Sequence, residues 1–307
     1  QIMVNHTTVM EFVLLGFSEV RELQLVHAVL FLLLYLVALT GNLLISAITT
    51  LDWHLHTPMY FFLRHLSILD LCLISITIPK SILVSLTTCY SISFLDCCLQ
   101  VLLVLLFATS ELFILTAMSY DHYTAICHPL RYEVIMAQGA CGKMAATSWL
   151  SKYLLGASLS AGALSLPICG SREIQQIFRD IPSLLKISCS EEHTTLDLTV
   201  AIGFCLTLFC FVSIVVSYMH IFSTLLRIQS EEGRSKTFST CLPHLTITSA
   251  FFTTGSFPYL APTSESPSAL DLLVYVFYTM VPPALNPLIY SLRNRDIKTS
   301  LGRVLQG

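Results

Sequence analysis

The chain has 307 residues, of which 54% are hydrophobic and only 11% carry a charge. Soluble domains usually carry about 25% charged residues, so this composition cannot supply a surface that faces water. The apolar residues come in long runs separated by short polar clusters, which is typical of a helical protein that crosses the membrane several times. The sequence contains no nucleic-acid-binding patch and no Gly-rich phosphate loop, and its net charge of -3 says little, since most charged residues lie in the loops.

The N-terminal segment, residues 1–22, is polar and precedes the first apolar run. It contains the triplet Asn5-His6-Thr7, which is an acceptor pattern for N-glycosylation of Asn5. Because this modification is made on the extracellular side, use of Asn5 would place the segment outside the cell. We therefore expect residues 1–22 to be an extracellular N-terminal segment.

The apolar runs that follow predict a membrane domain over residues 23–292. Each predicted span is long enough for a hydrocarbon core of about 30 Å. We expect seven spans, at Leu23–Ile48, Pro58–Leu83, Cys97–Tyr123, Ala140–Leu164, Asp197–Leu226, Thr237–Leu260 and Asp271–Tyr290. The fold class is therefore an all-α membrane protein, a bundle of seven transmembrane helices. Residues 293–307 predict a short amphipathic cytoplasmic helix.

The loops differ in charge on the two sides of the membrane. The largest loop, Pro167–Leu196, is polar and is expected outside, whereas Arg227–Lys236 is expected as a short charged inner loop. By the positive-inside rule the side rich in Lys and Arg is cytoplasmic, and the C-terminus lies there. The residues that set this orientation are Arg64, Arg131, Lys143, Arg227, Arg234, Lys236, Arg293, Arg295, Lys298 and Arg303.

A few polar residues lie inside the predicted spans. Gly41 permits close approach of a neighbouring helix, and the amide of Asn42 needs a partner within the bundle. Asp70 and Glu111 are carboxylic acids at membrane depth, where such groups face the bundle interior. Two like charges close together do not both stay ionised without a cation between them. A bound cation and protonated, hydrogen-bonded acids are both open interpretations, whereas a catalytic acid pair is not, because no nucleophile accompanies it.

Histidines are frequent on the expected inner side. A metal site would need two or more of them to converge with free ring nitrogens, and nothing in their spacing requires that. We interpret them as polar residues of the membrane interface: His54, His56, His122, His128, His220 and His244.

Five motifs identify a resemblance that covers the chain from the first inner loop to the tail. In order they read LHTPMYFFL (55–63), LSILDLC (66–72), MSYDHYTAICHPLRY (118–132), SKTFSTCLPHL (235–245) and PPALNPLIYSLRN (282–294). Their letters and spacing resemble those of the odorant receptors, a branch of the rhodopsin-like G-protein-coupled receptors. The resemblance implies a receptor of the plasma membrane and not an enzyme. Its expected partners are a small-molecule odorant, a heterotrimeric stimulatory G protein and membrane lipid, with no nucleic acid.

The alternative of a transporter is not favoured, because a transporter would show repeat symmetry and broken helices in both halves, which the sequence lacks.

The resemblance also implies a ligand pocket between the outer halves of the third, fifth, sixth and seventh spans. The positions carried over are mostly aliphatic or aromatic with a few hydroxyls, which predicts a mainly apolar pocket. Because no Asp or Lys stands among them, an amine ligand paired with a carboxylate is not expected. They are Val104, Leu105, Ala108, Thr109, Ile202, Leu206, Ser256, Tyr259, Val276 and Thr279.

A second group of positions is implied to switch the receptor and to contact the G protein. These are Asp121, His122, Tyr123, Tyr218, Asn286, Pro287 and Tyr290. Receptors of this class hold a sodium ion near the position of Asp70, and Asn286 is expected close by. Asp70 and Glu111 are therefore candidate sodium ligands, with the protonated pair as the alternative. No other cofactor is expected.

Three departures from the family pattern concern signalling and the disulfide bonds of the outer side. Arg179 stands where the family usually has the middle cysteine of the large loop. With that cysteine absent, a disulfide is expected between Cys169 and Cys189, and the alternative joins Cys97 to Cys189. In the sixth span, Phe251-Phe252-Thr253 replaces the usual Phe-Tyr-Gly.

The third departure is His122, which replaces the Arg of the family's Asp-Arg-Tyr triplet. Arginine is long, permanently charged and carries five donors, whereas histidine is shorter and its charge depends on pH near neutrality. We expect His122 to make a weaker resting contact with Asp121 and a poorer contact with the G protein. The main hypothesis is a weakly coupling odorant receptor. The alternative is a receptor fold with impaired coupling that acts as a binding or decoy surface.

Overall fold

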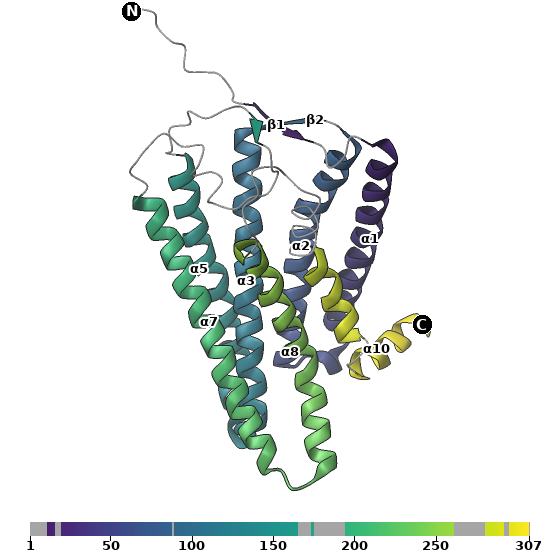
Figure 1. Cartoon of the computed structure of the whole chain (residues 1–307). Coiled ribbons are helices and arrows are strands. Elements are labelled where there is room, and N and C mark those ends of the chain that lie inside the picture. The colour runs from purple at the N-terminus through teal and green to yellow at the C-terminus, as the bar shows by residue number, and fades with distance from the viewer. Residues whose placement is uncertain are drawn as a thin grey trace, which may run out of the picture.

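The computed structural model describes residues 11–15, 20–87, 89–164, 173–174, 194–260, 280–291 and 295–306. Within these ranges long helices run side by side as a bundle (Figure 1). They are α1 (Arg21–Leu51), α2 (Pro58–Leu86), α3 (Phe94–Cys127), α5 (Gln138–Leu164), α7 (Thr194–Arg227), α8 (Glu231–Leu260) and the helical residues 280–291. Shorter elements are η1 (Trp53–Leu55), η2 (Pro129–Arg131), α4 (Tyr132–Ile135) and α10 (Arg295–Gln306).

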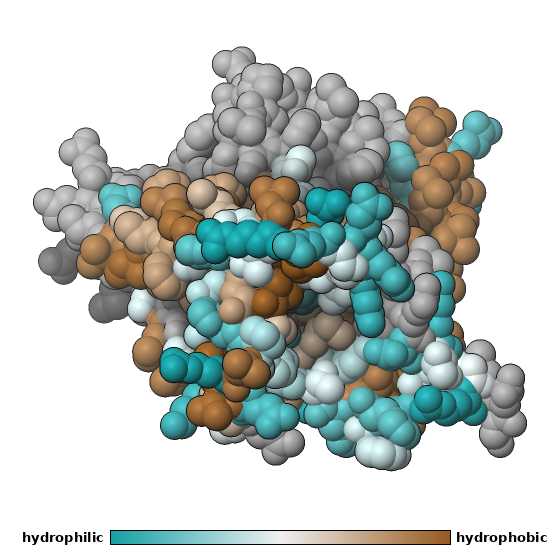
Figure 2. Space-filling view, turned by 90° about the horizontal axis from the view of Figure 1, so that it is seen from below, coloured by the Kyte–Doolittle hydropathy of each residue, from teal (hydrophilic) through white to brown (hydrophobic). Residues whose placement is uncertain are grey.

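These helices coincide with the seven predicted spans, the seventh over its inner part. Among the described residues, four helical segments are long and apolar enough to cross a membrane by length and composition: Arg21–Leu51, Pro58–Leu86, Leu102–Cys127 and Asp197–Arg227. The end of the bundle that carries α10 is called the inner end here, following the predicted orientation. That end presents a broad hydrophilic surface interrupted by a few hydrophobic side chains (Figure 2).

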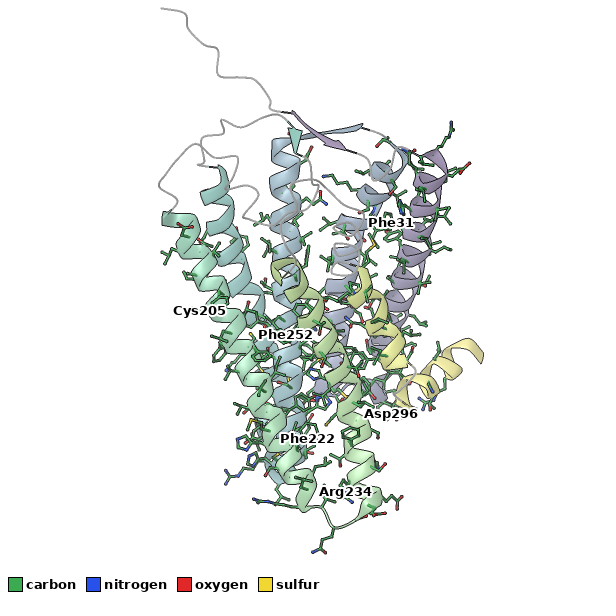
Figure 3. All side chains as sticks on the ribbon, viewed as in Figure 1. Phe31, Cys205, Phe222, Arg234, Phe252 and Asp296 are labelled. Carbon is green, nitrogen blue, oxygen red and sulfur yellow. The ribbon has the colours of Figure 1, made fainter. Side chains whose placement is uncertain are left out.

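The predicted inner loop Arg227–Lys236 is wrong in its extent. Helix α7 continues to Arg227 and α8 already begins at Glu231, so the connection is reduced to residues 228–230. Arg234 lies at the inner tip of α8, beyond the level of Asp296 in α10 (Figure 3). Both α7 and α8 extend beyond α10 at this end (Figure 1). A hydropathy pattern finds where the apolar run ends, but the backbone hydrogen bonds of a helix continue past that point.

Close packing of α1 against residues 280–291 depends on Gly41 and Asn42. A Cβ atom added at Gly41 would lie 2.8 Å from Cγ and 2.9 Å from Cβ of Pro287, so the helices approach too closely for any larger residue. Next to it, Asn42 Nδ2 donates to the carbonyl oxygens of Pro283 (2.9 Å) and Ala38 (3.0 Å). The predicted roles of Gly41 and Asn42, close approach and an internal amide partner, are confirmed.

A small sheet lies at the outer end and was not predicted. Strand β1 (Glu11–Leu15) is its central strand, antiparallel to β2 (Cys89–Ser93) and parallel to β3 (Glu173–Ile174). Part of the predicted N-terminal segment thus links the start of α3 to the large outer loop. The five-residue strand is too short for a clear alternating pattern, and its partners are distant in sequence.

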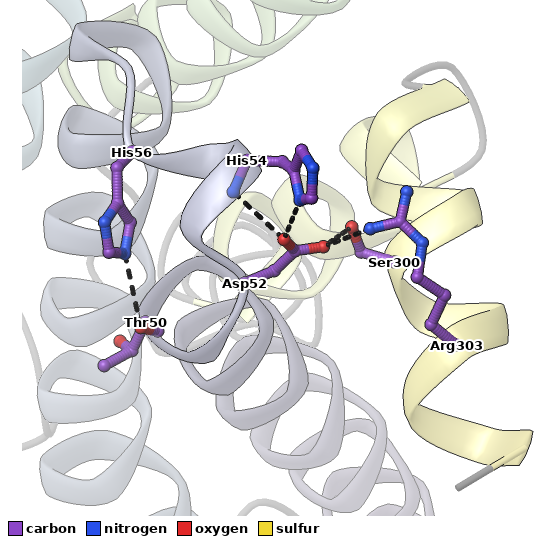
Figure 4. Close-up of polar contacts among 6 residues, drawn as sticks. All are labelled: Thr50, Asp52, His54, His56, Ser300 and Arg303. Carbon is purple, nitrogen blue, oxygen red and sulfur yellow. Dashed lines mark hydrogen bonds and ion pairs between the residues drawn. The ribbon is translucent and has the colours of Figure 1, made fainter.

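At the inner end, α10 is held against the first inner turn by Asp52 (Figure 4). Asp52 Oδ2 accepts hydrogen bonds from Ser300 Oγ and from Arg303 Nη1, the latter at 2.9 Å, and Oδ1 accepts from the backbone N–H of His54 at 3.0 Å. A second link joins Tyr60, whose hydroxyl donates to Asp296 Oδ2 at 3.0 Å. Ile297 is buried within the main hydrophobic cluster, so α10 has an apolar face packed on the bundle, as its amphipathic pattern predicts.

We predict that Gly41→Ala lowers the melting temperature of the purified protein, because the added methyl overlaps Pro287. Overpacking of this kind costs about 1–3 kcal/mol. The matched control is Gly142→Ala, where nothing lies within 4 Å of the added Cβ. There the change removes backbone freedom and should be neutral or stabilise by about 0.5–1 kcal/mol. Equal melting temperatures for the two variants would contradict the close contact.

We predict that Asp52→Asn accelerates hydrogen exchange in residues 295–306, with exposed Glu133→Gln as the control. The hydrogen bonds from Ser300 and His54 lower the pKa of Asp52 from 3.8 to about 2, with the charge of Arg303 adding to this. A depressed carboxyl pKa stabilises the folded state above the unfolded pKa, and this contribution is lost as pH falls from 3.8 toward 2. The contact should therefore persist unchanged at neutral and mildly acidic pH, and unaltered exchange in Asp52→Asn would contradict it.

Candidate functional site

A buried polar centre joins three helices at mid-depth. Asn286 Nδ2 donates to Asp70 Oδ2 on α2 at 2.8 Å and to Glu111 Oε1 on α3 at 3.2 Å. Asp70 is fully buried, and only 2% of Glu111 and of Asn286 is exposed. The structure thus brings together the two acids and the amide that the sequence placed on separate spans.

Two oxygen atoms of this centre have no hydrogen-bond partner. They are Asp70 Oδ1 and Asn286 Oδ1, both inaccessible to solvent. Buried polar atoms are seldom left without a partner, and hard cations take oxygen ligands. The residues present therefore fit a sodium ion. They also fit a proton on Asp70 Oδ1, so both interpretations of the acid pair stay open. In the described part of the chain no group of three or more His, Cys, Asp or Glu residues could hold a metal ion.

His122 lies at the inner end of α3 with its ring turned along its own helix. Its Nδ1–H donates to the carbonyl oxygen of Met118 at 2.7 Å, and its ring lies 5.4 Å from that of His244 on α8, centre to centre. Only 5% of His122 is exposed. Between His122 and Asp121 the described contacts include no hydrogen bond or ion pair. The predicted weak resting contact between these neighbours stays a prediction.

Asp121 instead holds the second inner loop. Its Oδ1 accepts a hydrogen bond from the hydroxyl of Tyr132, in α4, at 2.8 Å. Burial and the adjacent Asp121 carboxyl raise the pKa of Tyr132 well above its usual range, so the hydroxyl keeps its proton as a donor. Two apolar residues of this loop face outward, with Leu130 100% and Val134 81% exposed. The hydrogen bond from Tyr132 to Asp121 thus holds the loop at the inner end of α3, and the loop presents apolar side chains to the inner side.

A polar network crosses the interior between α3, α7 and α8. His244 Nε2 lies 2.9 Å from the carbonyl oxygen of Leu115, and His244 Nδ1 lies 2.7 Å from the hydroxyl of Tyr218. A carbonyl oxygen can only accept, so Nε2 carries the hydrogen and Nδ1 accepts from Tyr218. We call Leu115, His122, Tyr218 and His244 the inner network. His244 was predicted only as an interfacial histidine; its place inside an apolar run of the sixth span is the signal that was available.

The remaining switch positions surround this network. Tyr290 is buried, and its hydroxyl lies 4.0 Å from Met118 Sδ. Pro287 packs against Gly41, as described above. Tyr123 is half-buried, and its hydroxyl lies 3.0 Å from His128 Nε2. The sequence placed these residues on separate motifs, and the structure gathers them at the inner half of the bundle.

Phe251-Phe252-Thr253, which departs from the family pattern, belongs to α8, and its two Phe side chains pack with residues of α3 and α7. The Phe252 ring meets that of Phe211 on α7 edge-on at 5.1 Å, and the Phe251 ring is nearly perpendicular to that of Phe252. Thr253 is exposed and its hydroxyl donates to the carbonyl oxygen of Ser249 at 2.7 Å. The two rings pack α8 against α7, while Thr253 adds no contact between helices in the described contacts.

Comparison with known proteins identifies the family. Residues 31–307 match the sequence profile described as "Olfactory receptor". Human olfactory receptor 14A16 is 53% identical over 99% of this chain and 98% of its own length, and human olfactory receptor 14K1 is 54% identical over 99% and 96%. Gorilla olfactory receptor 1G1 is 43% identical over 98% and 96%. The chain belongs to the olfactory receptor family.

As an olfactory receptor, the protein is an odorant-sensing G-protein-coupled receptor and not an enzyme. It is a multi-pass protein of the plasma membrane. These statements confirm the resemblance drawn from the five motifs.

The ligand-facing positions of this olfactory receptor are described in part. On α3, the side chains of Val104, Leu105, Ala108 and Thr109 are all half-buried. Thr109 Oγ1 donates to the carbonyl oxygen of Leu105 at 2.7 Å, so its proton is already engaged. On α7, Leu206 is half-buried and Ile202 is 46% exposed. The side chains of Ser256 and Tyr259, and the whole of Val276 and Thr279, lie outside the described residues. The pocket set as a whole stays a prediction.

The residues of the other predicted outer features are not described either. Asn5, Cys169, Arg179 and Cys189 fall outside the described residues, as does the side chain of Cys97. The glycosylation site and both disulfide pairings stay predictions.

Proposed function

We propose that this olfactory receptor binds small, mostly apolar organic ligands between the outer halves of its helices and signals through a stimulatory G protein. We further propose that His122 weakens this coupling at neutral pH. The observation that carries the proposal is the inner network, because it joins the three helices whose inner ends must separate when the sixth span swings.

The ligand class rests on the residues of α3. Val104, Leu105 and Ala108 offer only apolar surface, which favours hydrophobic contact as the main source of affinity. Thr109 is the polar residue among them, and its proton is used within the helix. Its oxygen can still accept, so a ligand hydroxyl is a better partner for Thr109 than a ligand carbonyl.

The signalling mechanism rests on what His244 connects. Its two ring nitrogens contact Leu115 on α3 and Tyr218 on α7, while the ring itself belongs to α8. An outward movement of the inner end of α8 must break the bond to Leu115 and change the bond to Tyr218. Ligand binding at the outer half would supply the free energy for this change by binding the moved state more tightly. Leu130 in η2 and Val134 in α4 are exposed and offer the apolar contacts that an intracellular partner would cover.

The weak coupling rests on the geometry of His122. Its one described hydrogen bond returns to its own helix, so it adds no polar link to α7 or α8. An arginine at the same place would reach further and carry five donors, enough to bond both the network and a partner's backbone. This same observation favours the second candidate function, a receptor fold that binds ligand but couples poorly and acts as a binding or decoy surface.

The buried polar centre is proposed to hold sodium in the resting receptor. The amide of Asn286 is uncharged and cannot balance two carboxylates in a low-dielectric interior, so a cation or protons must balance their charge. Asp70 Oδ1 and Asn286 Oδ1 would be the ligands, since these oxygens lack other partners. Bound sodium would link α2 to residues 280–291 and so stabilise the resting arrangement.

We predict that sodium raises the melting temperature of the purified receptor relative to N-methylglucamine at equal ionic strength. A ligand that binds only the folded state stabilises it by about 2.7 kcal/mol at a hundredfold excess over Kd. Asp70→Asn should abolish the sodium effect, and Asp197→Asn, which removes an exposed carboxylate, should retain it. An identical sodium response in wild type and Asp70→Asn would leave protonation as the explanation of the acid pair.

We predict that His122→Arg increases the maximal agonist response in a cyclic-AMP reporter assay at equal surface expression. The gain should be about fivefold, equivalent to ~1 kcal/mol from one added hydrogen bond. His220→Arg is the control, because it adds the same group on an exposed position of α7. If wild type signals as strongly as His122→Arg at all ligand doses, His122 does not limit coupling. If both variants and wild type bind ligand without any response, the decoy function is favoured.

A further inference from the structure

A polar pair at the outer ends of α2 and α3 takes no part in the inner network or the buried polar centre. Lys80 Nζ, on α2, donates a hydrogen bond to Gln100 Oε1 on α3. Lys80 lies within two turns of the outer end of α2, and Gln100 within two turns of the start of α3. The two residues therefore meet at one depth, on the outer side where the ligand is proposed to bind.

Gln100 is buried and incompletely bonded. Only 7% of the residue is exposed, and its Nε2 atom has no hydrogen-bond partner. The orientation of the amide is fixed by Lys80, because an ammonium can only donate and so selects the amide oxygen. Flipping the amide would place two donors face to face. The N–H groups of Gln100 are thus buried donors, and buried donors normally have an acceptor.

The place of Gln100 on α3 connects this pair to the ligand-facing positions. Gln100, Val104 and Ala108 are spaced four residues apart, so they follow one another along the same face of the helix. A molecule lying along Val104 and Ala108 would therefore bring its outer end to Gln100 and Lys80. This face of α3 is apolar at Val104 and offers hydrogen-bond donors one turn further out, at Gln100.

We propose that Lys80 and Gln100 form a subsite for the carboxylate of a small organic acid, whose apolar chain lies along Val104 and Ala108. This inference rests on the proposed ligand site and specifies its ligand class. One carboxylate oxygen accepts from Lys80 Nζ and the other from Gln100 Nε2, which pairs a charged and a neutral donor with the two oxygens. A carbonyl oxygen can use only part of this arrangement, and an amine is repelled by the ammonium. The expected order of affinity at equal chain length is acid, then aldehyde, then alcohol, then alkane.

The test measures ligand binding to the purified receptor by thermal shift, which does not require coupling. The probes are matched series of short- and medium-chain fatty acids, aldehydes, alcohols and alkanes. Lys80→Met removes the charge at similar length, and Gln100→Glu keeps a partner for Lys80 but presents a negative charge to the acid. Both should weaken fatty-acid binding at least about tenfold and leave alkane binding within about twofold, since an alkane makes no hydrogen bond to either residue. Lys80→Arg should retain acid binding.

The outcomes separate this inference from the proposed function. If alcohols and alkanes stabilise the receptor but acids do not, or if the variants weaken all ligands equally, the subsite is wrong and the proposed apolar site stands. If no member of any series stabilises the wild type, the proposed ligand class fails and the subsite fails with it. Retained alkane binding in Lys80→Met and Gln100→Glu also shows that the variants are folded.

Discussion

The structure depends on the bond between Asn286 and the two acids of its polar centre. A charged or polar side chain in the apolar layer costs several kcal/mol unless it finds a partner in the bundle. Asn286 gives Asp70 and Glu111 such a partner and so fixes residues 280–291 against α2 and α3. The contact of Gly41 with Pro287, the residue after Asn286, then brings α1 to the same helix. Four helices are thereby positioned through a few small or polar residues.

The sequence predicted the fold because membrane insertion leaves few choices. A backbone in lipid must satisfy its own hydrogen bonds, so each long apolar run becomes a helix, and its position follows from hydropathy alone. The prediction was wrong where that constraint ends. Helix α8 begins at Glu231, inside a run of charged residues that was predicted as a loop. Strand β1 pairs with strands far away in the sequence, and no local sequence pattern predicts that pairing. Water permits several backbone conformations there, and contacts between distant segments decide among them.

The candidate site was predicted residue by residue but not as an arrangement. The motifs pointed to Asp121, His122 and Tyr218, yet they did not reveal that His244 bonds Tyr218 while Asp121 bonds Tyr132. Such pairings depend on how each helix is rotated about its axis. Spacing within one helix fixes which residues share a face, but the partner across the interface depends on packing between helices. The same reason explains why Lys80 and Gln100, twenty residues apart on two helices, drew no attention in the sequence.

The histidine at position 122 changes the kind of interaction that holds the inner end closed. An arginine would form charged hydrogen bonds with distant partners. His122 instead packs its ring near that of His244 and donates a hydrogen bond to the carbonyl oxygen of Met118 in its own helix. Contact between two buried rings depends on shape and is lost over a short displacement, so little free energy is needed to separate α8 from α3 at this point. The hydrogen bond from His244 to Leu115 and the apolar contacts of α8 with α3 also hold the two helices together. Under the proposed function, the opened inner end lacks a long cation that could bond a partner, so we propose that recognition of the G protein is the step that His122 limits.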